Sequence, residues 1–260
     1  MPDMELEGQV AVVTGAAQGI GEAIAHRFAA AGARVVVADL QAEKAETVAN
    51  AIRSAGGEAR AEVVDIASKD SVAALSSRVR SAYGSVALLV NNAAFIPIGP
   101  LLDMDVAEWD RAIMTNLSGS FYVSRAFVDD MIQGGGGSII VVSSVNGLRA
   151  QVGLSAYNVS KAGLVMLAKT MALELAPLGI RVNAIAPGDI DTQVAAVVAD
   201  RATAEANVPL GRFGRPDEVA ETALFLASSR SSYTTGGVFT VDGGLNAQLY
   251  PDNVGLGRAQ

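Results

Sequence analysis

Segments typical of β-strands alternate with segments typical of helices along nearly the whole chain, which limits the possible folds more than any other feature. The strand candidates, short and rich in Val, Ile and Ala, are residues 10–14, 35–38, 61–65, 88–91, 138–143, 181–186 and 238–241. Helical patterns lie between them, near residues 19–31, 41–55, 69–83, 105–132, 155–177 and 216–228. Such alternation predicts a parallel sheet with helices on both faces, and strands as apolar as 139–142 fit burial on both sides.

Tyr157 and Lys161 lie four residues apart in one of these helical patterns, so their side chains share one face of the predicted helix. An ammonium group one turn from a phenol stabilises the phenolate and is expected to lower the phenol's pKa from its usual value of about 10. Tyr157 would then exchange protons nearer neutral pH, which is acid–base chemistry without histidine. The alternative interpretation is an incidental Tyr and Lys on a helix, because short motifs often occur by chance.

A glycine-rich turn follows the first strand candidate. It reads Thr-Gly-Ala-Ala-Gln-Gly-Ile-Gly over residues 14–21 and leads into a helical pattern. Glycines let a backbone approach a pyrophosphate closely, and the following helix offers free N–H groups and the positive end of its dipole. The spacing differs from the G-x-G-x-x-G fingerprint, so a glycine-rich turn without a ligand is the alternative.

These motifs together resemble the short-chain dehydrogenase/reductase family. The resemblance rests on the glycine turn, Asn91-Asn92-Ala93, Asn116, Ser144, Tyr157-x-x-x-Lys161 and Pro187-Gly188, which occur in the family's order and spacing over most of the chain. One departure is Ala94, where the family often has glycine, and its methyl group is expected to narrow the space beside the nicotinamide. The resemblance implies one Rossmann-type, doubly wound α/β domain with a parallel seven-stranded sheet and helices on both faces.

The predicted cofactor is NAD. Asp39 ends the second strand candidate, about twenty residues after the glycine turn, where a carboxylate can bind the ribose hydroxyls and repel a 2′-phosphate. Gln18 in the turn, and Leu40-Gln41 after Asp39, carry no positive charge. The alternative for Asp39 is capping the helix at 41–55. From these residues and the resemblance, the expected cofactor-binding residues are Gly15, Gln18, Gly19, Ile20, Gly21, Asp39, Leu40, Asp65, Ile66, Asn92, Ala93, Tyr157, Lys161, Pro187, Gly188, Ile190 and Thr192.

The resemblance assigns catalysis to Asn116, Ser144, Tyr157 and Lys161. Tyr157 exchanges the proton of a substrate alcohol, Ser144 holds the substrate oxygen, and Lys161 stabilises the phenolate and binds the nicotinamide ribose. Asn116 is expected to kink its helix and position a water for a proton relay to Lys161. The expected substrate-binding residues are Ser144, Asn146, Gln151, Tyr157 and Asp189, and further pocket-facing candidates are Phe95, Ile96, Val145 and Val194.

The predicted reaction is hydride transfer between NAD(H) and a secondary alcohol or ketone, and the mixture of amides and apolar walls favours a small polyol, sugar or other hydroxylated substrate. Within the same enzyme class, the alternative is a 3-oxoacyl-(acyl carrier protein) reductase. This chain has Gly135 and Leu178 where that group carries arginines, which disfavours the carrier. A non-catalytic dinucleotide-binding scaffold or redox sensor is an alternative of another class, because a fold does not fix a function.

Composition excludes several other functions. The formal net charge is −8 and no basic run occurs, which argues against a nucleic-acid surface. The chain has no cysteine and a single histidine, His26, so we expect no disulfide, no thiol nucleophile and no metal site. The acidic N-terminus does not resemble a secretory signal, and no apolar run is long enough to span a membrane. A cytoplasmic location is therefore expected.

We expect a single NAD-binding domain over residues 1–260, with a substrate lid at about 190–214 and a C-terminal tail at about 246–260. The alternatives are a rigid surface helix for the lid, and a tail that is disordered or packed on a partner. The stretch 163–175 is apolar on more than one helical face, and the 105–132 pattern carries Phe121, Tyr122 and Phe127. Such helices could pair about a two-fold axis, so a homotetramer is predicted, the alternative being that both faces are covered within one chain.

Overall fold

A single sheet of seven parallel strands forms the centre of the computed structural model, which describes residues 5–193 and 201–248. The strands lie in the spatial order β3-β2-β1-β4-β5-β6-β7. Their bounds are β1 (Val10–Thr14), β2 (Arg34–Asp39), β3 (Glu58–Val63), β4 (Leu88–Asn91), β5 (Gly137–Val142), β6 (Ile180–Pro187) and β7 (Val238–Val241). The predicted Rossmann-type fold, with a parallel seven-stranded sheet between helices, is confirmed.

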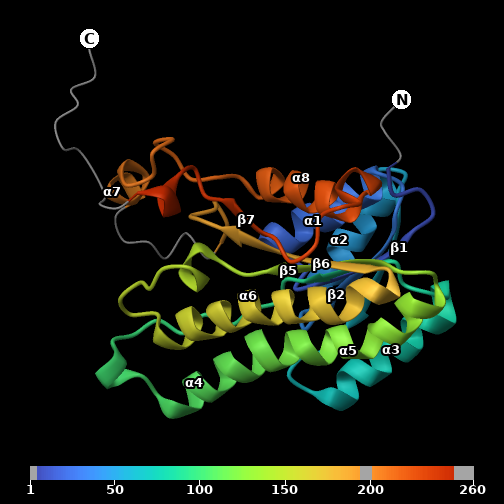
Figure 1. Cartoon of the computed structure of the whole chain (residues 1–260), viewed down its shortest axis with the longest axis horizontal. Coiled ribbons are helices and arrows are strands. Elements are labelled where there is room, and N and C mark those ends of the chain that lie inside the picture. Colours follow the sequence, from blue (N-terminus) through green and yellow to red (C-terminus); the bar gives the residue numbers. More distant parts are fainter. Residues whose placement is uncertain (1–4, 194–200, 249–260) are drawn as a thin grey trace, which may run out of the picture.

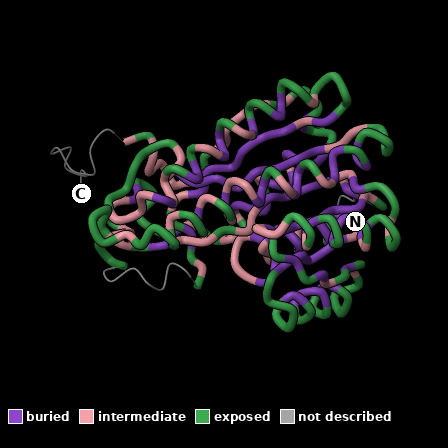
Figure 2. The backbone as a smooth tube through the Cα atoms, turned by 90° about the horizontal axis from the view of Figure 1, so that it is seen from below, coloured by how far each residue is buried: buried purple, intermediate pink, exposed green. Residues whose placement is uncertain are grey.

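Helices cover both faces of this sheet (Figure 1). On one face lie α1 (Gly19–Ala30), α2 (Ala42–Ser54) and α8 (Pro216–Ala227). On the other face lie α3 (Lys69–Tyr83), α4 (Val106–Ala112), α5 (Ser120–Gln133) and α6 (Ser155–Leu175). Alternate side chains of the central strands, such as β1 and β2, therefore enter two separate cores, and Figure 2 shows buried strands inside a more exposed helical layer.

The order in which successive strands join the sheet reverses between β1 and β4. Strands β2 and β3 lie on one side of β1, and strands β4 to β7 lie on the other side. In open parallel sheets, the connections on the two sides of such a point separate and leave a crevice at the carboxyl ends of the strands. The glycine turn after β1 and the Asn92-Ala93 segment after β4 border this crevice. The topology therefore determines where a ligand can enter.

Two expected elements differ from the sequence prediction. The third strand runs over Glu58–Val63 rather than 61–65, because its pairing with β2 begins in a polar stretch that apolarity does not reveal. Asp65 and Ile66 therefore follow this strand instead of ending it. The expected helix at 105–132 is divided into α4, a π-helical segment over Ile113–Gly119, and α5.

The lid and tail predictions fall partly outside the described residues. In the lid, α7 (Arg201–Ala206) is described and lies beyond the carboxyl ends of the strands (Figure 1), whereas residues 194–200, and with them Val194, are outside the description. Of the tail, residues 246–248 are described. No helix within the described ranges is long and apolar enough to cross a membrane.

Candidate active site

A cavity of about 770 Å³ lies at the carboxyl ends of the strands. Its lining includes nearly all the residues expected to bind the cofactor, namely Gly15, Gln18, Gly19, Ile20, Asp39, Leu40, Asp65, Ile66, Asn92, Ala93, Tyr157, Lys161, Pro187, Gly188, Ile190 and Thr192. The expected substrate-binding residues Ser144, Asn146, Gln151, Tyr157 and Asp189 line the same cavity. Gly21 and Asn116 do not line it. The fold thus brings a candidate cofactor site and a candidate catalytic site into one space.

The glycine turn fits closely against the Asn92-Ala93 segment. Gly15 has a φ of +63°, and a Cβ at this position would lie 2.6 Å from Ala93 Cα. Gly21 is buried, and its Cβ would lie 2.2 Å from the carbonyl oxygen of Gly15, so this glycine shapes the turn instead of facing the cavity. Asn92 Nδ2 ties the two segments by donating to the carbonyl oxygens of Thr14 and Gly15. A side chain at either glycine would displace this wall of the cavity.

Asp39 is buried at the cavity wall, where both carboxylate oxygens accept hydrogen bonds from the backbone. Oδ2 accepts from Ala17 N at 3.0 Å, and Oδ1 accepts from Gln41 N at 2.9 Å. Asp39 is not the N-cap of α2, as the alternative predicted, because the N-cap residue is Gln41, and Asp39 accepts from the backbone N–H of that residue. Asp39 instead fixes the glycine turn with its negative charge beside the cavity.

Ser144, Tyr157 and Lys161 meet where β5 ends and α6 begins. Ser144 follows β5 and hydrogen-bonds the Tyr157 phenol. Lys161 lies one turn after Tyr157, with its Nζ 5.4 Å from the centroid of the Tyr157 ring, and Nζ donates to the carbonyl oxygen of Val142 at 2.8 Å. The three side chains predicted to act together are therefore neighbours, and Lys161 is anchored to the sheet.

The pKa values of this group differ from the expectation. Although part of Tyr157 faces the cavity, burial raises the pKa of its phenol to about 12, and the hydrogen bond with Ser144 offsets this only in part. Burial lowers the pKa of Lys161 to about 7. Lys161 therefore loses much of its positive charge near neutral pH, and the prediction that it lowers the pKa of Tyr157 is wrong.

Asn116 lies in the π-helical segment and is fully buried. Its Oδ1 accepts from Phe95 N at 2.7 Å, and its Nδ2 donates to Phe95 O and to Ser160 Oγ. The side chain therefore joins the segment after β4 to α6 beside Tyr157. The expected irregularity of the helix is present, and the water relay through Asn116 stays a prediction.

Three amide side chains form a hydrogen-bonded group beside Ser144, and one carboxylate lines the same cavity. Asn146 donates its backbone N–H to Ser144 Oγ at 3.1 Å, and its side chain contacts those of Gln151 and Asn158. Asp189 lines the cavity from the segment after β6, and burial raises the pKa of its carboxyl group. Asn158 was not singled out from the sequence, since an Asn beside a motif tyrosine carries no local signal of its contacts.

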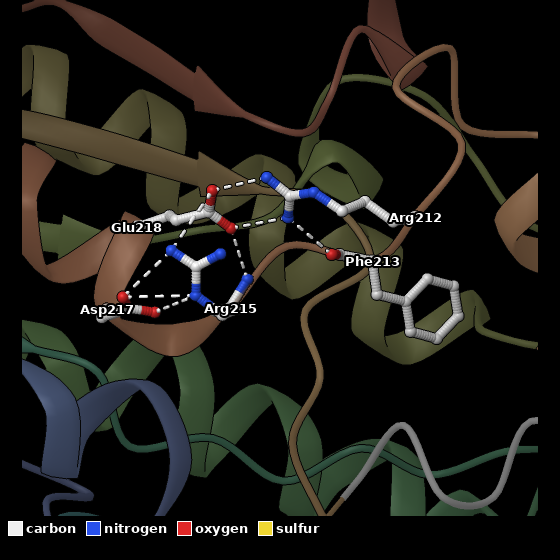
Figure 3. Close-up of polar contacts among 5 residues, drawn as sticks. All are labelled: Arg212, Phe213, Arg215, Asp217 and Glu218. Atoms are coloured by element: carbon white, nitrogen blue, oxygen red, sulfur yellow. Dashed lines mark hydrogen bonds and ion pairs between the residues drawn. The ribbon is translucent and has the colours of Figure 1, made fainter.

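Phe213 is a second residue that the sequence did not reveal. Its buried ring lines the cavity, although the chain reaches it only after α7. Figure 3 shows how ion pairs hold the adjacent backbone: Arg212 donates to both oxygens of Glu218 and to the carbonyl oxygen of Phe213, and Glu218 also accepts from Arg215 N. These contacts lower the pKa of Glu218 to about 2.

The cavity fits a dinucleotide by the chemistry of its walls. The N-terminus of α1 has no side-chain cap, so its backbone N–H groups are available to an anion such as a pyrophosphate. The buried carboxylate of Asp39 provides acceptors for ribose hydroxyls. The described residues contain no group of three or more His, Cys, Asp or Glu side chains that could hold a metal ion.

Known proteins of similar sequence are reductases and dehydrogenases. Residues 15–246 match a family described as enoyl-(acyl carrier protein) reductase. The chain is 42% identical to a 3-oxoacyl-[acyl-carrier-protein] reductase FabG of Thermotoga maritima, over 93% of this chain and 99% of that protein. It is 46% identical to a cis-4-hydroxycyclohexanecarboxylate dehydrogenase of Sinomonas cyclohexanicum, over 92% of this chain and 97% of that protein.

Solved structures agree with these relatives. A short-chain type dehydrogenase/reductase from Mycobacterium marinum matches with a TM-score of 0.91 and 37% identity, over 95% of this chain and 98% of that one. A putative NAD(P)-dependent gluconate 5-dehydrogenase from Beutenbergia cavernae, with NADP bound at low occupancy, matches with a TM-score of 0.90 and 37% identity, over 95% of this chain and all of that one. By its sheet, its motifs and these relatives, the chain belongs to the short-chain dehydrogenase/reductase family of oxidoreductases.

Proposed function

We propose that the protein transfers a hydride between NAD(H) and a secondary alcohol or ketone, and that its substrate is a small hydroxylated compound such as a polyol or sugar derivative. The observation that carries this proposal is the position of Ser144, Tyr157 and Lys161 in the same cavity as the glycine turn and Asp39. A scaffold or redox sensor without turnover would not need a proton-exchanging phenol beside the substrate end of a cofactor cavity.

In this mechanism, Tyr157 moves the proton. In oxidation the alcohol loses a hydride to the cofactor and a proton to Tyr157, and in reduction Tyr157 returns a proton to the carbonyl oxygen. Ser144 hydrogen-bonds the same oxygen and fixes the reacting carbon in place. Lys161 holds the nicotinamide ribose, and the bound nicotinamide supplies the hydride chemistry. Burial raises the pKa of Tyr157 to about 12, so the phenol is protonated at neutral pH and can donate its proton in reduction. In oxidation Tyr157 must be the phenolate in order to accept the proton of the alcohol.

NAD is proposed as the cofactor because the buried carboxylate of Asp39 lines the cavity beside the glycine turn, and a carboxylate near the adenosine ribose would repel a 2′-phosphate. NADP is the alternative, and two observations favour it. The related structure from Beutenbergia cavernae has NADP bound. Lys44 donates to Gln18 Oε1 at 3.2 Å and so brings a positive charge near the glycine turn.

A reductase of 3-oxoacyl thioesters on a carrier protein is the second candidate for the substrate, and the Thermotoga maritima relative favours it. The exposed Gly135 and Leu178 disfavour it here, because docking of an acidic carrier requires basic groups at the surface. The Sinomonas cyclohexanicum relative, which acts on a hydroxylated ring, favours the small substrate.

A homotetramer is proposed as the assembly. The outer sides of α5 and α6 expose large apolar side chains, including Phe121, Met166 and Leu173, with exposed fractions of 49%, 62% and 81%. Phe127 does not contribute, because it is fully buried in the core. Apolar side chains on two neighbouring helices suit pairing with a second copy about a two-fold axis.

A panel of substrates tests the proposed function. Secondary alcohols and polyols would be assayed with NAD and with NADP by the absorbance of the reduced cofactor. A 3-oxoacyl thioester, free and on a carrier protein, would be assayed in the reducing direction. The proposal expects the highest kcat/KM for a small hydroxylated substrate with NAD. A higher value for the carrier-bound thioester would support the second candidate, and absence of turnover on the whole panel would support the sensor.

A further inference from the structure

Asn158, Asn146 and Gln151 form a connected group of amide side chains beside Ser144. Asn158 Nδ2 donates to the backbone carbonyl oxygen of Gln151 at 2.8 Å. Asn146 Nδ2 donates to Asn158 Oδ1 at 3.1 Å and to Gln151 Oε1 at 3.2 Å. Asn146 and Gln151 line the cavity, whereas Asn158 does not. Asn158 therefore hydrogen-bonds two residues that line the cavity without lining it itself.

A single backbone carbonyl sets the orientation of all three amides. A carbonyl oxygen can only accept, so Asn158 must turn its nitrogen toward Gln151 O and its oxygen toward Asn146. Asn146 must then offer both N–H groups to Asn158 and Gln151, and its own Oδ1 faces Ser144 Oγ at 3.4 Å. Each amide is thus oriented by the one before it.

Gln151 is the last of the three amides to be oriented, and this group of amides leaves its side-chain N–H donor unused. Because Gln151 Oε1 accepts from Asn146, its nitrogen faces the other way. Within residues 5–193 and 201–248, Gln151 Nε2 has no hydrogen-bond acceptor. A donor fixed in orientation at a cavity wall can bind an oxygen of a ligand at little cost in conformational entropy.

We infer that Gln151 Nε2 binds a second oxygen of the substrate, beside the oxygen held by Ser144 and Tyr157, and that Asn158 is the positioning residue that aims it. The inference rests on the proposed function and makes it more specific. The preferred substrates carry a hydroxyl or carbonyl oxygen next to the reacting carbinol, as vicinal diols and hydroxyketones do. A simple secondary alcohol leaves this donor unused.

Matched substrate pairs test the inference. The ratio of kcat/KM would be measured for cis-1,2-cyclohexanediol over cyclohexanol and for 2,3-butanediol over 2-butanol. In the wild type the ratio is expected to be about tenfold, the effect of one good hydrogen bond. Gln151→Glu removes the donor and keeps the acceptor toward Asn146, and Asn158→Leu removes the orienting contacts at similar volume. Both variants are expected to lower the ratio to about one.

The ratio separates positioning from general damage. A loss transmitted through Ser144, or a partly unfolded protein, lowers kcat/KM for both members of a pair and cancels in the ratio. Asn50→Leu, an exposed Asn on α2, is the control and is expected to keep the wild-type ratio. A wild-type ratio near one, or an Asn158→Leu variant that keeps the tenfold preference, would overturn the inference.

A binding measurement tests the inference independently of the proposed function, because it requires no turnover. Pinacol has no hydrogen on its carbinol carbons and cannot lose a hydride, and 2,3-dimethyl-2-butanol lacks its second hydroxyl. Calorimetry on the protein saturated with NAD is expected to give a severalfold lower Kd for pinacol, and Gln151→Glu is expected to abolish the difference. This outcome would support the subsite even if no alcohol were oxidised, and equal Kd values in the wild type would overturn it.

Discussion

Lys161 Nζ lies 5.4 Å from the centroid of the Tyr157 ring, yet its hydrogen bond goes to the carbonyl oxygen of Val142. The ammonium group of Lys161 is therefore hydrogen-bonded to the end of β5 and not to the phenol. Because burial raises the pKa of Tyr157 to about 12 and lowers that of Lys161 to about 7, Tyr157 holds its proton and Lys161 loses much of its charge near pH 7. The position of the two groups favours catalysis, whereas burial shifts their pKa values in opposite directions.

Tyr157→Phe is expected to lower kcat at least about 100-fold, because the phenol is the proposed proton-exchanging group and the ring is retained. NADH binding, measured by fluorescence titration, is expected to stay within about threefold of the wild type. Near-normal turnover of the variant on a good substrate would disprove the mechanism.

Lys161→Met is expected to remove a pH dependence of stability. The pKa of Lys161 is about 7 in the folded protein and close to the usual 10.5 in the unfolded chain. Between these values the unfolded chain binds more protons, so the free energy of unfolding rises with pH from about 7 toward 10.5. Tyr157 acts in the opposite direction only above about pH 10.

Urea unfolding without cofactor would measure this effect between about pH 6 and pH 9. The free energy of unfolding of the wild type is expected to rise relative to that of Lys161→Met over this range. All other titratable groups are common to the two proteins, so their contributions cancel in the difference. Parallel pH profiles for the two proteins would contradict the prediction.

Asp39→Ala is expected to relax the preference for NAD over NADP, because it removes a ribose acceptor and the charge that repels a phosphate. The ratio of kcat/KM for the two cofactors measures this. The variant also leaves the backbone N–H of Ala17 without its partner, at a cost of about 1–3 kcal/mol of stability. Asp39→Asn, which keeps one acceptor, serves as the comparison. A wild type that already prefers NADP would refute the assignment.

Glu218→Gln is expected to loosen the backbone at Phe213 and so to raise KM more than it lowers kcat. The pKa of Glu218 is lowered from 4.5 to about 2, first by its hydrogen bond with Arg212. Its stabilising effect is therefore full above about pH 4.5 and is lost as the pH falls toward 2.

Thermal unfolding would measure the stabilising effect of Glu218 and its dependence on pH. The Tm of Glu218→Gln is expected to lie slightly below that of the wild type at pH 7, with the gap narrowing as the pH falls from about 4.5 toward 2 and shrinking in high salt. Asp129→Asn, which breaks the exposed ion pair of Asp129 with Arg125 on α5, is the control and should leave KM unchanged. An unchanged KM for Glu218→Gln would rule out a role in holding Phe213.

Leu173→Glu is expected to dissociate the proposed tetramer. The side chain is 81% exposed in the single chain, so a charge there should not unfold it, whereas a charge buried between two copies is costly. Light scattering would report the mass, and activity should fall together with it. Val63→Glu, at another exposed apolar position, is the control. A wild type that is a fully active monomer would refute the assembly.

The sequence by itself determined the sheet and most of the candidate site. Parallel strands require helical connections, so the alternating pattern predicted the layers, and β1, β4 and β7 begin and end where their apolar runs do. Because the carboxyl ends of parallel strands meet at one edge, residues at the end of a strand or just after it, such as Asp39, Ser144 and Asp189, could be placed in one cavity. These features follow from local periodicity and from chain order.

Only the tertiary structure decided the features that depend on burial and on long-range contacts. It showed that burial opposes the expected pKa shift of Tyr157, that Gly21 and Asn116 support the cavity without lining it, and that β3 begins in polar residues. It also showed that Asn158 hydrogen-bonds the backbone of Gln151 and that Phe213 lines the cavity. A residue's degree of solvation and its hydrogen-bond partners far along the chain are set by packing, so no local pattern in the sequence specifies them.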